Sequence, residues 1–160
     1  MTNCIINYSY NRYVYDPNTN CNTPVLVVKY KNKDFRNKNI TEIDFHKRGI
    51  NANRLNDIVE QLKDCEFTNG EFDLIDFSTN EIDDNAAEIL KKFFDKYLTN
   101  PKSIDLSDNK LGSAVAKVLE EVLPRYKWLM KLFLINTNFT IEEQESIKKA
   151  ANRYTDIVFE

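Results

Sequence analysis

Ser103-Ile104-Asp105-Leu106-Ser107-Asp108-Asn109-Lys110-Leu111-Gly112 is the stretch of the chain that decides the fold. Apolar residues at positions 104, 106 and 111 surround a single amide, Asn109. Because alternate residues of a strand point to the same face, Ile104 and Leu106 predict a short strand with one buried side. The frame reads apolar, any residue, apolar, two more residues, Asn, any residue, apolar.

The same frame recurs before and after this stretch. Its anchor residues are Ile43, Ile75, Ile104 and Leu132, spaced by 32, 29 and 28 residues, and a half-copy begins at Ile157. Such a recurrence predicts parallel strands, since parallel pairing needs a long crossover that the intervening residues supply as a helix. No single unit can bury its own apolar side, so the units must stack.

The Asn of the frame has a separate role where each strand turns away from the sheet. Backbone groups there lose their ladder partners, and a buried amide offers them both a donor and an acceptor. We expect Asn80 and Asn109 to be such structural amides. The last repeat carries Thr137, whose hydroxyl substitutes in part, and the first carries Arg48, which we expect to turn outward.

Apolar residues between the strands recur at three- and four-residue spacings that predict helices. The predicted stripes cover residues 55–65, 86–97, 115–123 and 140–154. The last stripe begins with a capping box formed by Thr140 and Glu143. Because helices are wider than the spacing of paired strands, stacking such units must curve the array with its strands on the inner side.

The motif, the long helices and a period of about 28 residues resemble the ribonuclease-inhibitor-like class of leucine-rich repeats. The resemblance covers residues 39–160 and is most specific in segments 104–112 and 75–83. It implies an α/β fold, a right-handed βα solenoid with parallel strands on the concave side and helices on the convex side, which binds proteins along its concave face. The family includes intracellular eukaryotic proteins and effectors secreted by intracellular bacteria.

We therefore expect one domain over residues 1–160, with three parts. Residues 1–38 would form an N-terminal β cap, in which a turn-rich segment from Asp16 to Pro24 separates strands. Residues 39–140 would carry the leucine-rich repeats, and residues 141–160 would form a C-terminal cap helix and strand.

Composition sets the remaining bounds. The 160 residues are 42% hydrophobic with a net charge of −3, which supports a core and shows no bias toward nucleic acid. Residues 1–8 lack the pattern of a signal peptide, and no run approaches the ~20 apolar residues of a membrane helix. The odd count of cysteines (Cys4, Cys21 and Cys65) favours free thiols over a Cys4–Cys21 bridge, hence a reducing compartment. We expect a cytoplasmic protein, or one delivered into a host cytosol if it is a pathogen effector.

The partner-binding residues predicted on the concave face are Asp44, His46, Asp76, Ser78, Asp105, Ser107, Asp108, Phe133 and Ile135. A column of three aspartates would favour a cationic partner, although Asp is also common at this position in the family. Phe133 and Ile135, with Trp128 nearby, would be aromatic and aliphatic anchors beside a polar rim. The alternative is that the C-terminus or a neighbouring chain covers them.

Signals for catalysis are weak. The chain has one histidine, His46, and three glycines, with no Gly-rich phosphate loop and no Cys/His cluster, so we predict no catalytic residues, cofactor or metal. A basic run at positions 29–38 suggests a nucleic-acid patch or, as we favour, a solvated strand edge.

We expect a non-catalytic protein–protein interaction module, an effector or adaptor, with no nucleic acid or membrane among its partners. The alternatives are a structural subunit or homodimer docking through the apolar C-terminal half of the sheet and, from the resemblance alone, a small-GTPase regulator, to which no residue can be matched.

Overall fold

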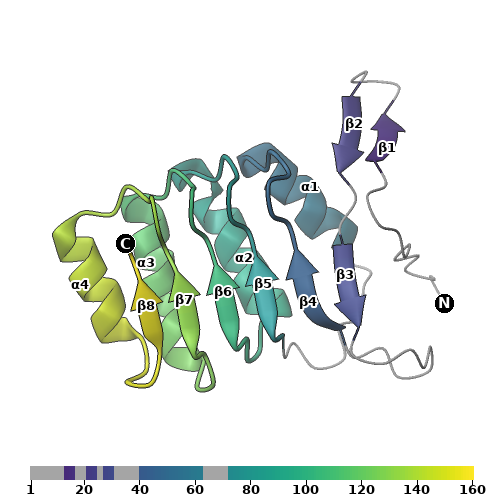
Figure 1. Cartoon of the computed structure of the whole chain (residues 1–160). Helices are drawn as coiled ribbons and strands as arrows, with labels where there is room; N and C mark the ends of the chain where they lie inside the picture. The colour runs from purple at the N-terminus through teal and green to yellow at the C-terminus, as the bar shows by residue number, and fades with distance from the viewer. Residues whose placement is uncertain (1–12, 17–20, 25–26, 31–39, 63–71) are drawn as a thin grey trace.

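A sheet in the order β3-β4-β5-β6-β7-β8 runs through the molecule (Figure 1). The computed structural model describes residues 13–16, 21–24, 27–30, 40–62 and 72–160. The sheet strands are β3 (Val27–Tyr30), β4 (Ile40–Asp44), β5 (Leu74–Asp76), β6 (Ser103–Asp105), β7 (Lys131–Phe133) and β8 (Asp156–Val158). Strands β4 to β8 are parallel, and β3 pairs antiparallel with β4.

The helices lie side by side on one face of this sheet (Figure 1). They are α1 (Ala52–Leu62), α2 (Ala87–Tyr97), α3 (Ser113–Val122) and α4 (Ile141–Ala150), with 3-10 turns η1 (Asp84–Ala86) before α2 and η2 (Leu123–Arg125) after α3. None of them, in the part of the chain that the structure describes, is long and apolar enough to cross a membrane. We call the opposite side of the sheet, which no described helix covers, the open face.

The anchor residues of the sequence frame lie opposite one another across the parallel strands. Ile43 pairs with Ile75, Ile75 with Ile104, Ile104 with Leu132, and Leu132 with Ile157. The first four are fully buried between the sheet and the helices. The prediction of an α/β chain with parallel strands and intervening helices is confirmed.

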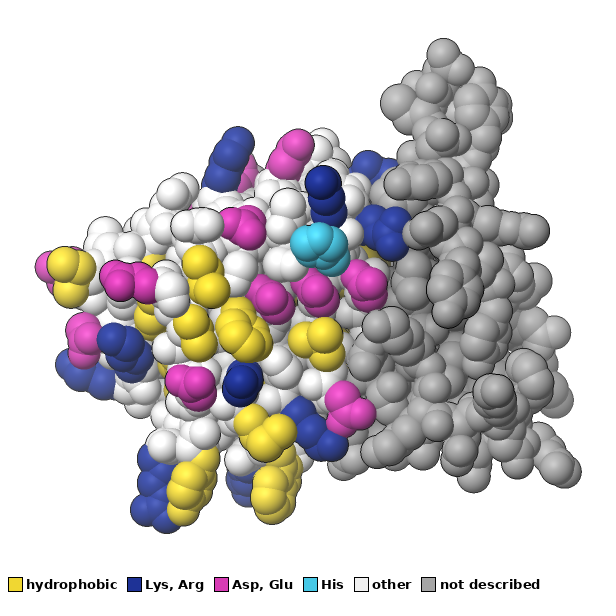
Figure 2. All heavy atoms as spheres, viewed as in Figure 1, with side chains coloured by type: hydrophobic (Ala, Val, Ile, Leu, Met, Phe, Trp, Pro, Cys, Tyr) yellow, Lys and Arg dark blue, Asp and Glu magenta, His cyan; other side chains and the backbone are white. Residues whose placement is uncertain are grey.

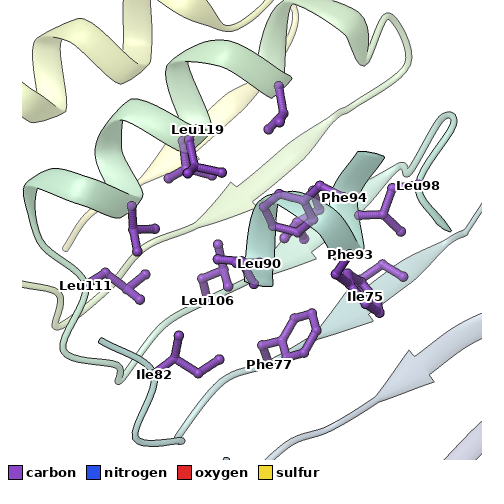
Figure 3. Packing of buried hydrophobic residues seen from close by; sticks show 14 of the residues in the cluster. Ile75, Phe77, Ile82, Leu90, Phe93, Phe94, Leu98, Leu106, Leu111 and Leu119 are labelled. Carbon is purple, nitrogen blue, oxygen red and sulfur yellow. The ribbon is translucent and has the colours of Figure 1, made fainter. Parts of the chain in front are cut away.

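Aromatic rings fill the first half of the core. Phe45 and Phe77 stack with their ring centroids 4.7 Å apart. Phe93 of α2 meets Phe77 edge-on at 5.2 Å, and Figure 3 shows both of these rings in the core. Phe93 also lies 5.4 Å from the ring of Tyr97, one turn further along α2. Edge-on and offset ring pairs add to the free energy gained from burial alone. Phe93 therefore joins helix α2 to two successive units of the sheet.

The N-terminus of α3 is capped by a side chain from the preceding unit. Asp84 Oδ1 accepts a hydrogen bond from the Gly112 amide at 2.9 Å, and Oδ2 accepts from the Ala114 amide at 3.1 Å. A carboxylate there satisfies free helical N–H groups and complements the helix dipole. A Cβ at position 112 would lie 2.9 Å from Asp84 Oδ2, which explains the glycine.

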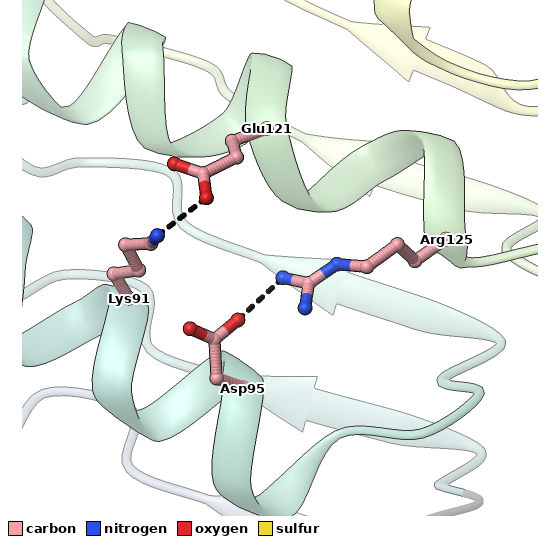
Figure 4. A network of polar contacts seen from close by, with 4 residues as sticks. All are labelled: Lys91, Asp95, Glu121 and Arg125. Atoms are coloured by element: carbon pink, nitrogen blue, oxygen red, sulfur yellow. Dashed lines mark hydrogen bonds and ion pairs between the residues drawn. The ribbon is translucent and has the colours of Figure 1, made fainter.

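Two ion pairs connect the outer surface of α2 with that of α3 and of the η2 turn that follows it (Figure 4). Lys91 pairs with Glu121, and Asp95 pairs with Arg125. The hydrogen bond from Lys91 to Glu121 raises the pKa of the lysine. Because these groups are exposed and screened by salt, they contribute little to stability beside the aromatic core.

The last helix begins as predicted and ends earlier than predicted. The capping box is confirmed: Thr140 Oγ1 accepts from the Glu143 amide at 3.2 Å, and Glu143 Oε2 accepts from the Thr140 amide at 2.9 Å. The extension to Tyr154 is wrong, since α4 ends at Ala150 and Ala151 is extended. Asn152 turns the chain because its amide donates to carbonyls of the loop before β7.

The N-terminal part contains a strand that the sequence interpretation missed. Strand β2 (Cys21–Pro24) pairs antiparallel with β1 (Tyr13–Asp16), inside the segment from Asp16 to Pro24 that was expected to be turn-rich. Cross-strand pairing thus overrides the turn propensity of its Asn, Thr and Pro residues. The remaining N-terminal predictions, including those for Cys4 and most of the basic run, lie outside the described residues, as does Cys65.

Candidate functional site

Three aspartates stand in register in the middle of the open face. Asp44 pairs with Asp76 across β4 and β5, and Asp76 pairs with Asp105 across β5 and β6. The row continues with Phe133 on β7 and Val158 on β8. Figure 2 shows the three acidic side chains side by side, with hydrophobic side chains next to them. All five residues are half-buried.

One carboxylate oxygen of each of these aspartates bonds to the backbone of its own unit. The Oδ1 atoms of Asp44, Asp76 and Asp105 accept hydrogen bonds from the backbone amides two residues later, at 2.9, 2.8 and 2.9 Å. These bonds hold the backbone where it leaves the strand. Among the described residues, no donor bonds the Oδ2 atom of any of the three. One carboxylate oxygen in each unit is therefore available to a ligand.

A second row lies one step further along the strands and includes two serines that were expected to line the binding surface. Ser78 and Ser107 are only 7% exposed each, so that part of the expectation is wrong. Ser78 Oγ donates a hydrogen bond to Asp76 Oδ1 at 2.6 Å and lies 2.8 Å from His46 Nδ1. Ser107 Oγ accepts from the Ile135 amide at 3.2 Å. Both hydroxyls support neighbouring backbone and side chains.

The Asp76, Ser78 and His46 side chains form a hydrogen-bonded chain. Since the single hydroxyl proton of Ser78 goes to Asp76, the proton between Ser78 and His46 belongs to His46 Nδ1. A serine nucleophile needs the opposite order, with its proton directed to a histidine base. The arrangement holds the exposed His46 ring over the first strands rather than activating Ser78.

The residues after this row all adopt a left-handed backbone conformation. Lys47, Thr79, Asp108 and Asn136 have φ between 52° and 55°. Asp108 Oδ1 accepts from Asn136 Nδ2 at 2.7 Å, and its Oδ2 accepts from Thr79 Oγ1 at 3.4 Å. Asp108, a predicted binding residue, therefore joins three units at the rim of the open face. Neither Thr nor Lys signals this conformation in a sequence, because both disfavour it.

The other half of the open face is apolar. Phe133, Ile135 and Val158 are half-buried on or beside the last two strands. Leu74 is also half-buried but lies at the start of β5, in the acidic half, two residues before Asp76. Leu74 and Val158 were missing from the predicted site, although the alternation of each strand could have placed them there. Trp128, expected to be exposed near Phe133, lies in the loop before β7 and is 69% exposed.

The structural amides join each unit to the one before it. Asn80 Oδ1 accepts from the amides of Arg48 and Ile50 at 2.9 and 3.0 Å. Asn109 Oδ1 accepts from the Ile82 amide at 3.0 Å, and its Nδ2 donates to the Phe77 carbonyl at 2.9 Å. Both amides are buried, as the argument from the frame expects.

The two exceptional repeat positions behave differently. Thr137 Oγ1 donates to the Leu134 carbonyl within its own unit at 2.9 Å, which is the partial substitution expected of a hydroxyl. Arg48 was expected to turn outward, and it does so only in part, since the residue is half-buried and its Nε atom is fully covered. Arg48 is held at the start of the array because its amide bonds to Asn80.

Among the described residues, no three His, Cys, Asp or Glu side chains come together as they would around a metal ion. No family model matches the chain. No curated protein sequence matches it either. The geometry of the open face is therefore the feature of the molecule that bears on its function.

Proposed function

We propose that the chain is a short leucine-rich repeat solenoid of the ribonuclease-inhibitor-like class that binds a protein partner on its open face, without catalysis. The in-register anchors and the buried amides Asn80 and Asn109 support the repeat assignment. The observation that carries the binding function is a single row of side chains across five strands, acidic on the first three and apolar on the last two.

The acidic half favours a cationic partner. Carboxylates about 5 Å apart on neighbouring strands repel by under about 1 kcal/mol in water and by several times that once a partner excludes water. A Lys or Arg side chain placed over the free Oδ2 atoms relieves this repulsion with charge-assisted hydrogen bonds. His46, exposed beside the row, adds a further polar contact.

The apolar half supplies the complementary anchor. Phe133, Ile135 and Val158 form one patch directly beside Asp105, so a partner that places an apolar side chain next to a basic one matches both halves. Desolvated apolar anchors with a polar surround are the usual energetic centre of a protein interface. Specificity then comes from the order of the two halves along the row.

The test is affinity capture with the immobilised full chain and two open-face variants. Asp44→Asn/Asp76→Asn/Asp105→Asn removes the charge but keeps each Oδ1 acceptor, so the strand ends stay intact. Phe133→Ser/Ile135→Ser removes the apolar anchor. A matched control, Lys92→Ser/Lys117→Ser, changes exposed residues on α2 and α3.

We expect the wild type to capture a protein, and the Lys92→Ser/Lys117→Ser control should capture it too. At least one of the two open-face variants should fail to capture it. A partner bound equally by all four proteins would contradict it. The affinity of the captured protein for the wild type and for each variant is then measured directly by titration.

A homodimer through the apolar half is the second candidate, because the same half-buried patch could be covered by another copy. Sedimentation velocity over a concentration series separates the two. A dimer that Phe133→Ser/Ile135→Ser dissociates would favour self-association, whereas a monomer with an intact patch would leave the open face for a different protein.

A further inference from the structure

A second surface lies at the edge of the sheet where β7 and β8 begin. Trp128, Met130 and Tyr154 are 69%, 57% and 73% exposed, and we call these three residues the edge cluster. Within residues 43–60 and 72–160, Ile141 is the one other large hydrophobic side chain that is this exposed. Figure 2 shows hydrophobic and basic side chains projecting together along this lower edge. Exposed apolar groups gathered in this way mark an interaction site.

The two loops that carry the edge cluster are fixed to each other. Asn152 Nδ2 donates to the carbonyls of Tyr126 and Leu129 at 3.1 and 3.4 Å. Thr155 Oγ1 donates to the Leu129 carbonyl at 2.7 Å, and the Asp156 amide donates to the Met130 carbonyl at 2.8 Å.

Buried residues also hold the two loops of the edge cluster in place. Tyr126 and Leu129 are each 1% exposed, and they flank the exposed Trp128 in the same loop. The Tyr154 amide donates to Asn152 Oδ1 at 2.8 Å. Exposure of the Trp128 and Tyr154 rings is therefore built into the fold rather than produced by fraying of a helix end.

The charge around the edge cluster is the opposite of that on the open face. Lys127 and Arg153 are exposed beside it, and Asp156, which lies opposite Lys131 in the β7–β8 register, is an acidic residue close by. The Lys131 ammonium lies 5.8 Å from the centroid of the Phe133 ring and so belongs to the open face. The Arg153 guanidinium lies 4.6 Å from the centroid of the Tyr154 ring. This edge consequently favours an anionic ligand, whereas the aspartate row favours a cationic one.

We propose that the edge cluster docks on the surface of an anionic lipid bilayer. Trp and Tyr rings are most stable at the headgroup level of a membrane, and a neighbouring Met adds apolar contact just below it. Each basic side chain near an anionic leaflet strengthens attachment by about fivefold. Insertion of the aromatic and apolar side chains is weak alone, and so is the attraction of the basic side chains. Peripheral attachment requires both together.

The size and pattern of the edge cluster favour lipid over other ligands. Three side chains are few for a stable protein interface, which takes roughly 20–30 residues a side. Binding of single-stranded nucleic acid uses a continuous basic groove with stacked rings, and Asp156 interrupts the basic residues here. Docking by these loops needs no membrane-spanning helix, and it leaves the open face free for a protein partner.

The chain carries its own reporter for the test, because Trp128 is its single tryptophan. The full chain is mixed with vesicles of phosphatidylcholine alone or with added phosphatidylserine, and Trp emission and co-sedimentation are measured. We expect a blue shift and co-sedimentation with the anionic vesicles only, both reversed by salt. Lys127→Ser/Arg153→Ser should weaken binding by roughly 10- to 30-fold, from about fivefold per charge.

Two further variants locate the effect. Met130→Ser/Tyr154→Ser keeps the reporter and should abolish the blue shift, and Trp128→Ala should abolish co-sedimentation. Ile141→Ser, which changes an equally exposed residue at the start of α4, should change neither measurement. Far-UV circular dichroism checks that every variant is folded.

Several outcomes would overturn the proposal. They are an absence of blue shift with anionic vesicles, or a shift that persists in Met130→Ser/Tyr154→Ser. A Trp128 response to a single-stranded oligonucleotide but not to vesicles would assign the edge cluster to nucleic acid instead. Self-association that Trp128→Ala dissociates, without vesicle binding, would assign it to a second copy of the chain.

Discussion

Replacing Asn109 with Ala removes the amide that joins the second and third units of the sheet. Asn109 Nδ2 donates to the carbonyls of Phe77, Leu106 and Ser107, and Oδ1 accepts from the Ile82 amide. Some of these four backbone groups would keep another hydrogen bond without Asn109, and the others would not.

The structure shows which of the four groups keep another bond. The Phe77 carbonyl still accepts from Asn80 Nδ2 at 2.8 Å, and the Ser107 carbonyl still accepts from the Thr79 amide at 2.9 Å. Among the described residues, the Ile82 amide and the Leu106 carbonyl have no second partner. Two orphaned buried backbone groups at about 1–3 kcal/mol each give a loss of roughly 2–6 kcal/mol.

Asn80→Ala provides a rank-order check on this reasoning. It leaves the amides of Arg48 and Ile50 and the Phe45 carbonyl without a partner among the described residues, which is one group more. Its free energy of unfolding should therefore fall at least as far as that of Asn109→Ala. Asn138→Ala is the matched control, because Asn138 is exposed and outside the frame; its change should stay within about 0.5 kcal/mol.

The assay is urea denaturation followed by far-UV circular dichroism, since the exposed Trp128 reports poorly on the core. For a chain of this length, a loss of roughly 2–6 kcal/mol lowers the melting temperature by about 5–20 °C. Equal midpoints for Asn109→Ala and Asn138→Ala would refute the role of the amide. A smaller loss for Asn80→Ala than for Asn109→Ala would refute the count of orphaned groups.

Four further substitutions test separate parts of the structure by the same denaturation assay. Phe93→Ala should lower stability by about 3–5 kcal/mol, because it empties the centre of the aromatic core, and a loss under about 1 kcal/mol would contradict that packing. Thr79→Asn should raise stability by up to about 1 kcal/mol, since Asn tolerates the left-handed conformation that a β-branched residue resists. Tyr126→Phe should be neutral or stabilising, because burial raises the pKa of this phenol and no described residue bonds its hydroxyl; a clear loss would reveal a partner. A hydrogen bond from the Ser113 side chain is the largest cause that lowers the pKa of the Glu143 carboxyl. The wild type should therefore be more stable than Glu143→Gln near neutral pH, and this difference in the free energy of unfolding should shrink as the pH falls below about 4.5. A constant difference down to about pH 3 would contradict the shift.

The backbone plan of this protein was predictable because its signals are local and repeated. The spacing of Ile43, Ile75, Ile104 and Leu132 needs only the alternation of a strand and the length of a crossover, and the pairing register follows. The aspartate row of the open face follows too, since its members lie between anchors. The amide of Asn109 was identifiable from the loss of ladder partners where a strand ends.

Features that depend on contacts between units were not predictable. Ser78 is buried because His46, 32 residues earlier, lies over it, and no local pattern reports that contact. Tyr154 leaves the helical stripe because Asn152 bonds to carbonyls 23 to 26 residues away. The same bonds hold the loop of Trp128 against the loop of Tyr154, and periodicity does not predict such a contact.

The two surfaces divide the charge of the molecule. The open face presents free carboxylate oxygens next to Phe133, and the edge cluster presents Trp128 and Tyr154 among basic side chains. If both proposals hold, a membrane-docked chain keeps its acidic row accessible to a basic protein partner, because different loops and strands supply the two contacts.

The most direct test of the central proposal is photo-crosslinking from defined positions on the full chain. A benzophenone amino acid replaces Ile135 on the open face in one protein and Lys117, exposed on α3, in another. The account predicts that the captured partner crosslinks from position 135 and not from position 117, and that the Asp44→Asn/Asp76→Asn/Asp105→Asn variant weakens this crosslink. Crosslinking from position 117 alone would place the partner on the helices and contradict the account.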